Sequence, residues 1–312
     1  MHTPSTPAPQ PPDAPRVVIS GASGLIGRAL ARSLRSDGVA VTRLVRRAPR
    51  RPNEIEWRPG DAPLDPEVLA GARAVVCLNG ASIGRLPWSP AYRAALLDSR
   101  IAPTRTLAAA IRELGADAPA LLSASAVGYY GDRPGERLTE ASSPGSTFLA
   151  EICVAWERAA LEAGSRARVV LLRTAPLIDR GGVLKPLLLL TRLGLSGPLG
   201  GGRQRWPWIS LVDEVRAIRH LIDSDVSGPV NLAGPTPATA NDTGRALART
   251  LRRPFLIPAP AWALRLALGR DAADALLLSD ADVAPEALLD SGFTFTHRTV
   301  EEAVDAALAS DR

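Results

Sequence analysis

A glycine-rich turn near the start of the chain constrains the fold more than any other feature. The stretch GASGLIG places Gly21, Gly24 and Gly27 directly after the short β-branched run RVVIS and before an apolar pattern with helical spacing. Glycine permits a tight turn at the first position, a close approach of the backbone to a pyrophosphate at the second, and close packing of helix on strand at the third. The helix N-terminus then offers amide groups to the phosphates. The sequence therefore predicts a strand–turn–helix unit that binds a nucleotide cofactor.

Strand-like runs alternate with helical stretches through the first half of the chain. The strand-like runs lie at 16–20, 39–45, 73–80, 119–125 and 167–173, and the longest helical patterns lie at 89–115 and 146–164. Strands that are apolar throughout are typical of a parallel sheet covered by helices on both faces. We therefore expect an α/β fold with a Rossmann-type doubly wound parallel sheet.

After residue 175 the sequence becomes rich in glycine, proline and leucine, which indicates a second, smaller lobe. We expect a cofactor-binding domain over 16–178, with 206–233 returning to it, and a C-terminal substrate lobe formed mainly by 179–312. Residues 1–15 are polar and proline-rich, so we expect a flexible tail there.

Composition narrows the class of protein. Of the 312 residues 46% are apolar, yet no apolar run is long enough to span a bilayer and no signal peptide is recognisable. The net charge is +5, but the arginines are scattered, so a nucleic-acid partner is not expected. Cys77 and Cys153 lack metal-ligand spacing, and we expect no metal site. The expectation is a cytoplasmic protein with a small-molecule substrate and no membrane partner, and the sequence leaves the oligomeric state open.

The residues after the second predicted strand bear on the choice of cofactor. The strand ends in VRRAPRR, where an NAD site usually carries an acidic residue for the ribose 2′-hydroxyl. Arg46 and Arg47 stand there instead, and arginine accommodates the 2′-phosphate of NADP. The sequence predicts NADP(H) in preference to NAD(H).

The stretch SASAVGYYGD follows an apolar strand and offers Ser123, Ser125, Tyr129 and Tyr130. Hydride-transfer sites use a tyrosine as general acid or base, and a lysine four residues later lowers its pKa from about 10. No tyrosine of this chain is followed by lysine at that spacing, and the only lysine, Lys185, lies in the predicted second lobe. The usual tyrosine–lysine pair is therefore absent.

Several segments together resemble one family. GASGLIG, SASAVGYYGD, LLRTAPLI and WISLVDEV occur in the order of the extended short-chain dehydrogenase/reductases. The segment LGLSGPLGGGRQRWPWISLVD is similar to the YfcH-like branch, the epimerase family proteins, and the likeness covers nearly the whole chain after residue 16. The resemblance implies a Rossmann-type lobe that binds NADP(H) and a C-terminal lobe that closes over the nicotinamide.

The resemblance also implies individual site residues. Ser125 matches the active-site serine, and Asp213 matches an acid for which a helix N-cap is the structural alternative. The family more often has NLAG where this chain has CLNG, so the role of Asn79 stays open. With Arg47 and Ser123 added, the expected cofactor-binding residues are Gly21, Ala22, Ser23, Gly24, Leu25, Ile26, Gly27, Arg46, Arg47, Leu78, Asn79, Gly80, Ser123, Arg173, Thr174 and Ala175.

The predicted function is that of an NADP(H)-dependent oxidoreductase or epimerase-like enzyme acting on a small carbonyl or sugar-like metabolite. Ser125 would orient a substrate oxygen, and Tyr129 or Tyr130 would exchange the proton. An acid such as Glu151 or Asp132 is the second option for that role. The alternative is a regulatory or redox-sensing protein that binds NADP(H) without turnover. It gains weight if apolar side chains such as Phe148 fill the space over the nicotinamide.

Overall fold

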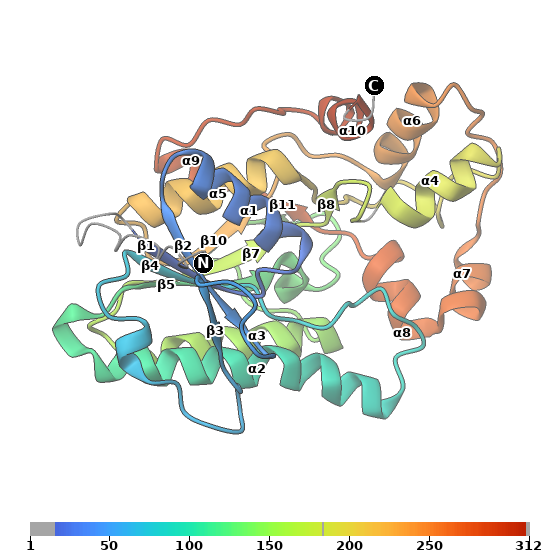
Figure 1. Cartoon of the computed structure of the whole chain (residues 1–312). Helices are drawn as coiled ribbons and strands as arrows, with labels where there is room; N and C mark the ends of the chain where they lie inside the picture. Colours follow the sequence, from blue (N-terminus) through green and yellow to red (C-terminus); the bar gives the residue numbers. More distant parts are fainter. Residues whose placement is uncertain (1–15, 183, 310–312) are drawn as a thin grey trace, which may run out of the picture.

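A parallel sheet forms the centre of the molecule, as the sequence predicts. The computed structural model describes residues 16–182 and 184–309, so the expected tail at 1–15 lies outside the described residues. Seven parallel strands follow the order β10-β7-β5-β4-β1-β2-β3 (Figure 1). They are β1 (Arg16–Ser20), β2 (Ala40–Val45), β3 (Glu54–Glu56), β4 (Ala74–Cys77), β5 (Ala120–Ala126), β7 (Val169–Thr174) and β10 (Gly228–Leu232). The strand order reverses between β1 and β4, and ligands of such sheets bind outside the carboxyl ends at that point.

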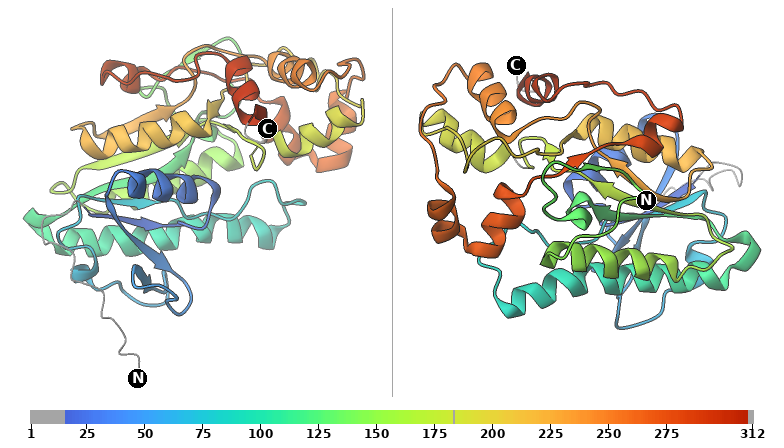
Figure 2. Two further views of the ribbon diagram at one scale, coloured as in Figure 1. Left: turned by 45° about the horizontal axis from the view of Figure 1, so that its top comes forward. Right: turned by 180° about the vertical axis from the view of Figure 1, so that it is seen from behind.

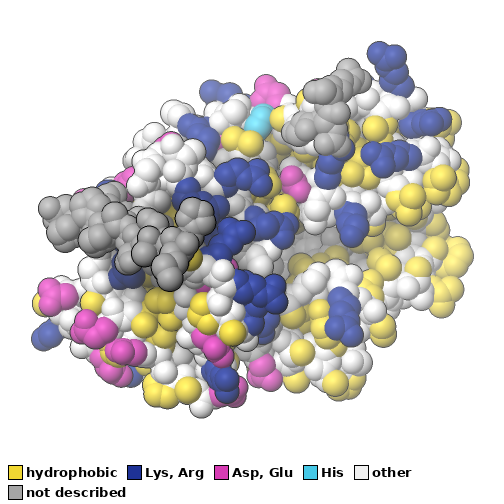
Figure 3. Space-filling view, viewed as in Figure 1, with side chains coloured by type: hydrophobic (Ala, Val, Ile, Leu, Met, Phe, Trp, Pro, Cys, Tyr) yellow, Lys and Arg dark blue, Asp and Glu magenta, His cyan; other side chains and the backbone are white. Residues whose placement is uncertain are grey.

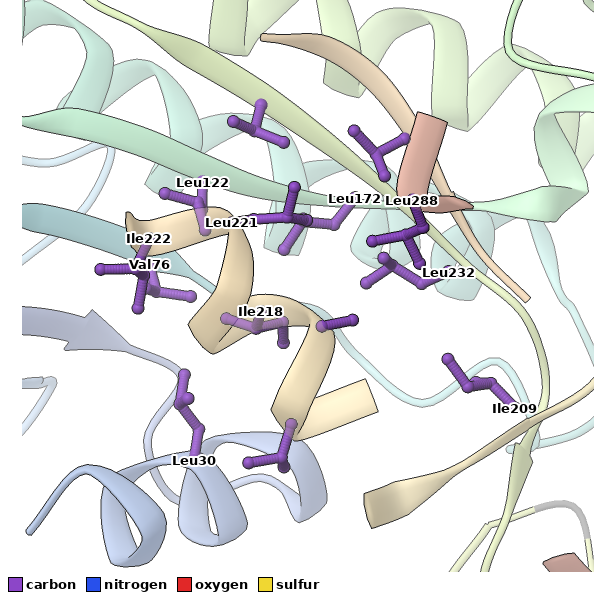
Figure 4. Packing of buried hydrophobic residues seen from close by; sticks show 14 of the residues in the cluster. Leu30, Val76, Leu122, Leu172, Ile209, Ile218, Leu221, Ile222, Leu232 and Leu288 are labelled. Atoms are coloured by element: carbon purple, nitrogen blue, oxygen red, sulfur yellow. The ribbon is translucent and has the colours of Figure 1, made fainter. Parts of the chain in front are cut away.

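Helices cover both faces of the sheet. One face carries α1 (Leu25–Ser36) and α5 (Leu211–Asp223), and the other carries α2 (Pro90–Glu113) and α3 (Phe148–Leu161) (Figures 1 and 2). Figure 4 shows the apolar core between the sheet and the first pair of helices, where side chains such as Leu30, Ile218 and Leu172 meet. Because both faces are covered, only the strand ends remain open to a ligand.

The smaller lobe lies beyond the carboxyl ends of the strands. Its helices are α4 (Leu184–Arg192), α6 (Ala240–Thr250), α7 (Ala261–Leu268), α8 (Arg270–Ala273) and α10 (Val300–Ala309), and α9 (Glu286–Asp290) packs beside β10. Two parallel strand pairs connect the parts of the molecule. They are β8 (Leu177–Ile178) with β9 (Ile209–Ser210), and β6 (Arg137–Leu138) with β11 (Asp282–Val283). The chain enters this lobe after β8, returns to the sheet with α5 and β10, and then leaves it again.

The part of the chain that the structure describes contains neither a membrane-spanning helix nor a metal-binding cluster. No helix within 16–182 and 184–309 is long and apolar enough to cross a bilayer. In the same residues no group of three or more His, Cys, Asp and Glu side chains is arranged to hold a metal ion.

Candidate dinucleotide and reaction site

The turn between β1 and α1 requires glycine at two of its positions. Gly21 has a φ of +74°, and a Cβ atom there would lie 2.4 Å from the carbonyl oxygen of Leu78. A Cβ on Gly27 would lie 2.5 Å from the carbonyl oxygen of Gly21, so the first turn of α1 rests directly on the loop. At Gly24 the nearest approach would be 3.3 Å, and that residue is exposed. The loop combines tight packing underneath with an open backbone above, as a pyrophosphate site requires.

The N-terminus of α1 leaves its amide groups available. Gly24 is the N-cap and provides no side-chain hydrogen bond, and the first turn contains no acidic residue. Free amides and the helix dipole together favour an anion. Of the other predicted loop residues, Ser23 is exposed and Ala22 is buried, whereas Leu25 and Ile26 are half-buried. The loop therefore fits a dinucleotide phosphate.

The two arginines after β2 differ in their contacts. The guanidinium of Arg47 makes a bidentate ion pair with Glu54, with N···O distances of 2.9 and 3.0 Å, and holds the pKa of that carboxyl well below its usual value. Arg46 is exposed and has no hydrogen bond or ion pair to another described residue. Arg46 is therefore the freer of the two to bind an anion.

The loop after β4 lies against the phosphate loop. Leu78 donates its amide to the carbonyl oxygen of Ser20 at 3.0 Å, and the Cys77 thiol lies 3.7 Å from the Asn79 side-chain oxygen. A Cβ on Gly80 would lie 3.1 Å from the guanidinium carbon of Arg100. Sequence reasoning missed Arg100, because its approach to this loop depends on how α2 packs across the sheet.

The ends of β5 and β7 carry a buried polar network. The Ser125 hydroxyl donates to Glu157 at 2.7 Å, and Arg173 makes two hydrogen bonds to the same carboxylate, at 2.8 and 2.9 Å. Arg173 also donates to the Tyr130 hydroxyl at 3.0 Å, and that hydroxyl donates to Asn231 at 2.6 Å. All five side chains are buried, and Tyr130 is 0% exposed. Glu157 and Asn231 were not predicted from the sequence.

This network gives two of the three predicted catalytic residues a structural role. Ser125 and Tyr130 already have protein partners, and burial raises the pKa of the Tyr130 hydroxyl. A raised pKa makes a tyrosine a weaker proton donor near neutral pH. Whether Ser125, Tyr129 and Tyr130 act on a substrate stays a prediction.

Tyr129 differs from its neighbour. It is half-buried, and its hydroxyl has no hydrogen bond to another described residue. The guanidinium carbon of Arg173 lies 3.5 Å from the centroid of the Tyr129 ring. A cation on a ring face is attractive and supplies positive charge close to the ring. Tyr129 is thus the tyrosine of this pair with a free hydroxyl and a cation beside it.

A buried carboxyl at the end of β7 was missed by sequence reasoning. The Thr174 hydroxyl donates to one oxygen of Glu214 at 2.9 Å, and the other oxygen has no hydrogen-bond partner among the described residues. Glu214 is 0% exposed, and burial raises its pKa to about 8. It follows Asp213 in the first turn of α5. The paired acids in WISLVDEV were its signal in the sequence.

The remaining predicted residues have mainly structural contacts. The Ser123 hydroxyl, which is wholly buried, contacts the carbonyl oxygen of Ala124 at 3.3 Å, and Ala175 is buried with its amide bound to Leu232. Asp213 accepts the amides of Thr296 and His297 at 2.7 and 2.9 Å, whereas Ser210 is the N-cap of α5. Asp213 therefore fastens the C-terminal segment to α5.

The start of α3 is apolar where a tyrosine–lysine pair would place its polar groups. Phe148 opens the helix, and Ile152 stands four residues later. Phe148 and Leu149 pack in an apolar cluster with Ala272 and Leu276 of the smaller lobe. Of the two acids considered as alternatives, Glu151 is exposed on α3, and Asp132 accepts the amide of Asp280 at 2.7 Å.

Comparisons with known proteins agree with this architecture. Residues 17–233 match the model of the NAD dependent epimerase/dehydratase family, and residues 259–307 match a domain of unknown function, DUF1731. Epimerase family protein Mb2239 of Mycobacterium bovis is 44% identical over 294 residues, which cover 93% of this chain and 97% of that protein.

Solved structures resemble the whole chain. The crystal structure of human epimerase family protein SDR39U1 (isoform 2) with NADPH has a TM-score of 0.85 and 29% identity, covering 95% of this chain and 100% of that one. The nucleoside-diphosphate sugar epimerase from Corynebacterium glutamicum has a TM-score of 0.76 and 31% identity, covering 96% of this chain and 59% of that one. The likeness therefore includes the smaller lobe as well as the sheet.

Proposed function

The chain belongs to the NAD-dependent epimerase/dehydratase family, as its motifs predict, and on this premise we propose that it is an NADP(H)-dependent oxidoreductase or epimerase-like enzyme. Its substrate is a small carbonyl or sugar-like metabolite. The observation that carries the proposal is the phosphate loop, where tight glycines lie beneath an uncapped helix N-terminus. The first amides of α1 have no partner within the helix and no side-chain cap, so they are available to a phosphate. When bound, the nicotinamide gives or takes a hydride, and the chain supplies binding, orientation and proton exchange.

The preference for NADP(H) over NAD(H) rests on Arg46. Its guanidinium is exposed and unpaired among the described residues, and no acidic residue stands at the end of β2 to bind a ribose 2′-hydroxyl. Arginine matches a phosphate in charge and geometry. The human relative, which is similar over nearly the whole chain, was crystallised with NADPH.

We assign proton exchange to Tyr129. Its hydroxyl is free of hydrogen bonds among the described residues, and Arg173 lies over its ring at 3.5 Å. Arg173 is the cation beside this tyrosine in a chain without the usual lysine, and Glu157 holds it through two hydrogen bonds. Ser125 and Tyr130 then act as positioning residues, because they hold Glu157 and Arg173 in place beneath Tyr129.

The family supports the proposed substrate class. The Corynebacterium glutamicum relative is a nucleoside-diphosphate sugar epimerase, which favours a sugar-like carbonyl or hydroxyl compound. We propose that the enzyme is cytoplasmic, where NADP(H) and such metabolites are available.

Isotope transfer tests the reaction. Purified protein is incubated with NADPH deuterated at C4 and a metabolite extract, and mass spectrometry then looks for deuterium in any metabolite. A labelled metabolite shows net hydride transfer and identifies the substrate class. No label in any metabolite, with NADPH still bound, contradicts net reduction. A transient internal hydride shift needs the oxidised cofactor as hydride acceptor, so it is then tested by adding NADP+ and nucleotide sugars and following epimer formation.

Two matched variants test the assignment of Tyr129. Tyr129→Phe is expected to reduce turnover by about a hundredfold, in the range of general acid–base catalysis, with NADPH affinity nearly unchanged. Tyr130→Phe removes the hydroxyl shared by Arg173 and Asn231, so it is expected to lower the melting temperature more than the rate. The reverse pattern overturns the assignment.

One observation favours a second candidate, a regulatory protein that binds NADP(H) without turnover. Phe148 and Leu149 of α3 belong to one apolar cluster with Ala272 and Leu276, so this cluster joins α3 to the smaller lobe. Apolar packing at that contact would link cofactor binding to the position of the lobe. Tight NADPH binding with neither label transfer nor epimer formation supports this candidate, and a labelled product excludes it.

A further inference from the structure

The short helix α7 exposes an apolar face to solvent. Its sequence AWALRLAL contains one polar residue, yet none of its eight residues is buried. Trp262 is 68% exposed and Leu266, one turn later, is 81% exposed. Exposed apolar area of this kind is unfavourable in water, so soluble proteins rarely present several such side chains together without a use.

Neighbouring segments extend this face. The amides of Leu256 and Ile257 both donate to the carbonyl oxygen of Ser196, which joins the segment before α7 to the segment after α4. The exposed apolar residues of these segments, which we call the α4–α7 surface, are Leu189, Leu190, Leu193, Leu195, Leu256, Ile257, Trp262 and Leu266. Figure 3 shows apolar side chains gathered at the end of the molecule where Figure 1 places α4 and α7.

The segments that carry the α4–α7 surface are rich in cations. Residues 184–205 and 251–270 contain eight Lys and Arg residues and no Asp or Glu. Lys185, Arg192, Arg252 and Arg253 are exposed and have no ion pair with another described residue. Arg265 and Arg270 share the single carboxylate of Asp274. The segments that form the surface therefore combine exposed apolar side chains with unpaired cations.

We propose that the α4–α7 surface docks onto an anionic lipid membrane. Leucine and tryptophan beside arginine and lysine are typical of helices that lie in the interface plane, where apolar side chains enter the acyl boundary and cations meet acidic headgroups. Such docking needs no spanning helix. It departs from the expectation of no membrane partner, which rested on the length of apolar runs and so addressed only spanning helices.

The charge distribution argues against two other occupants. In a symmetric dimer through this surface, the exposed cations of one copy that have no ion pair among the described residues would face the same cations of the other copy; they are Lys185, Arg192, Arg252 and Arg253. Binding to single-stranded nucleic acid relies on several aromatic stacking residues, and Trp262 is the one aromatic side chain of the surface.

Vesicle co-sedimentation of the full chain tests the proposal. Vesicles of phosphatidylcholine alone are compared with vesicles containing phosphatidylglycerol, at low and at physiological salt. We expect binding to the anionic vesicles, weakened by salt, and little binding to the neutral ones. The double variant Trp262→Glu, Leu266→Glu is expected to bind at least about tenfold more weakly. The double variant Lys185→Glu, Arg253→Glu is expected to lose most of the dependence on anionic lipid.

A matched control distinguishes binding through this surface from nonspecific adsorption of exposed apolar side chains. Leu161 on α3 is also exposed, at 56%, but lies outside the α4–α7 surface. Leu161→Glu is expected to bind vesicles like the unmodified chain. The proposal is overturned if Leu161→Glu loses as much vesicle binding as the Trp262 and Leu266 double variant. It is also overturned if the unmodified chain does not bind anionic vesicles. A concentration-dependent dimer that the Trp262 and Leu266 double variant abolishes assigns the surface to a second copy, and DNA binding lost in both charge and apolar variants assigns it to nucleic acid. NADPH affinity and melting temperature confirm that each variant is folded.

Discussion

At the carboxyl edge of the sheet, the loop after β1 leaves polar groups without partners, whereas the ends of β5 and β7 pair theirs with one another. Around the phosphate loop the α1 amides have no cap and Arg46 has no counter-ion among the described residues. At β5 and β7, Ser125, Glu157 and Arg173 satisfy each other while buried. A buried polar group without a partner costs free energy, so the paired groups at β5 and β7 stabilise the fold, whereas the exposed groups of the phosphate loop remain available to a ligand.

We call the phosphate loop with Arg46 the open region, and the buried network at the ends of β5 and β7 the paired region. The largest loss of stability is expected where the paired region loses a charge. Glu157→Gln leaves the Arg173 guanidinium buried without its carboxylate, and loss of one partner of a buried ion pair costs about 3–5 kcal/mol. Urea denaturation measures the free energy of unfolding. The exposed pair of Arg105 and Glu162, at 3.0 Å, is the control, and Glu162→Gln is expected to cost under about 1 kcal/mol. Equal losses in the two variants contradict the comparison.

The next effect concerns the open region. A Cβ in Gly27→Ala meets the Gly21 carbonyl oxygen at 2.5 Å, so the loop must shift away from its ligand-binding shape. We expect NADPH affinity to fall about a hundredfold, or about 2.7 kcal/mol. Gly201→Ala is the matched control, because a Cβ there has no neighbour within 4 Å. Titration of NADPH fluorescence measures both. If the Gly27→Ala variant is folded and its NADPH affinity is unchanged, the phosphate loop does not bind the cofactor.

Glu214 combines features of both regions. One of its carboxyl oxygens has a hydrogen bond, and the other has none among the described residues. Its folded-state pKa is raised to about 8. Between the ordinary carboxyl pKa of about 4.3 and that value, the folded state keeps a proton that the unfolded state has released. The contribution of this group to stability therefore falls as pH rises through that window.

Glu214→Gln removes this titration while keeping an acceptor for Thr174. The shift spans about 3.7 pH units, so we expect the variant to be more stable than the unmodified chain at pH 9 by at most about 5 kcal/mol, with little difference at pH 4.5. Denaturation curves across this pH range measure the effect. Glu113→Gln, at an exposed position on α2, serves as control and is expected to leave the pH dependence unchanged. A constant difference at all pH values contradicts a titrating Glu214.

The sequence predicts the open region better than the paired one, for a physical reason. Gly21, Gly24 and Gly27 and the strand β1 act within a few residues of one another, so their local pattern already specifies the turn. The other long strands are also apolar runs. In contrast, β3 was missed, because Glu54–Glu56 has no apolar run and is a strand only through its pairing with β2.

The ion pair of Glu157 and Arg173 depends on packing between α3 and β7, which no local pattern specifies. Helical periodicity did contain a signal, since Glu157 lies one turn after Cys153 on the buried face of α3. A carboxylate at a buried helical position requires a partner, and Arg173 at the end of an apolar strand was the available cation. The sequence motif alone assigned that arginine to the cofactor.

The smallest expected effect concerns Arg46 and Arg47, two adjacent arginines of which only the second is paired. Arg46→Ala removes the unpaired guanidinium, and we expect NADPH affinity to fall about tenfold, or about 1.4 kcal/mol, with NADH affinity unchanged. Arg47→Ala instead releases Glu54, whose buried carboxyl then lacks its bidentate partner. That variant is expected to lose stability with a nearly constant NADPH-to-NADH ratio of affinities. Isothermal titration with both cofactors measures the ratio. If Arg47→Ala changes this ratio and Arg46→Ala does not, Arg47 must leave Glu54 to bind the 2′-phosphate. The absence of protein partners would then not identify the residues that bind the cofactor at this site.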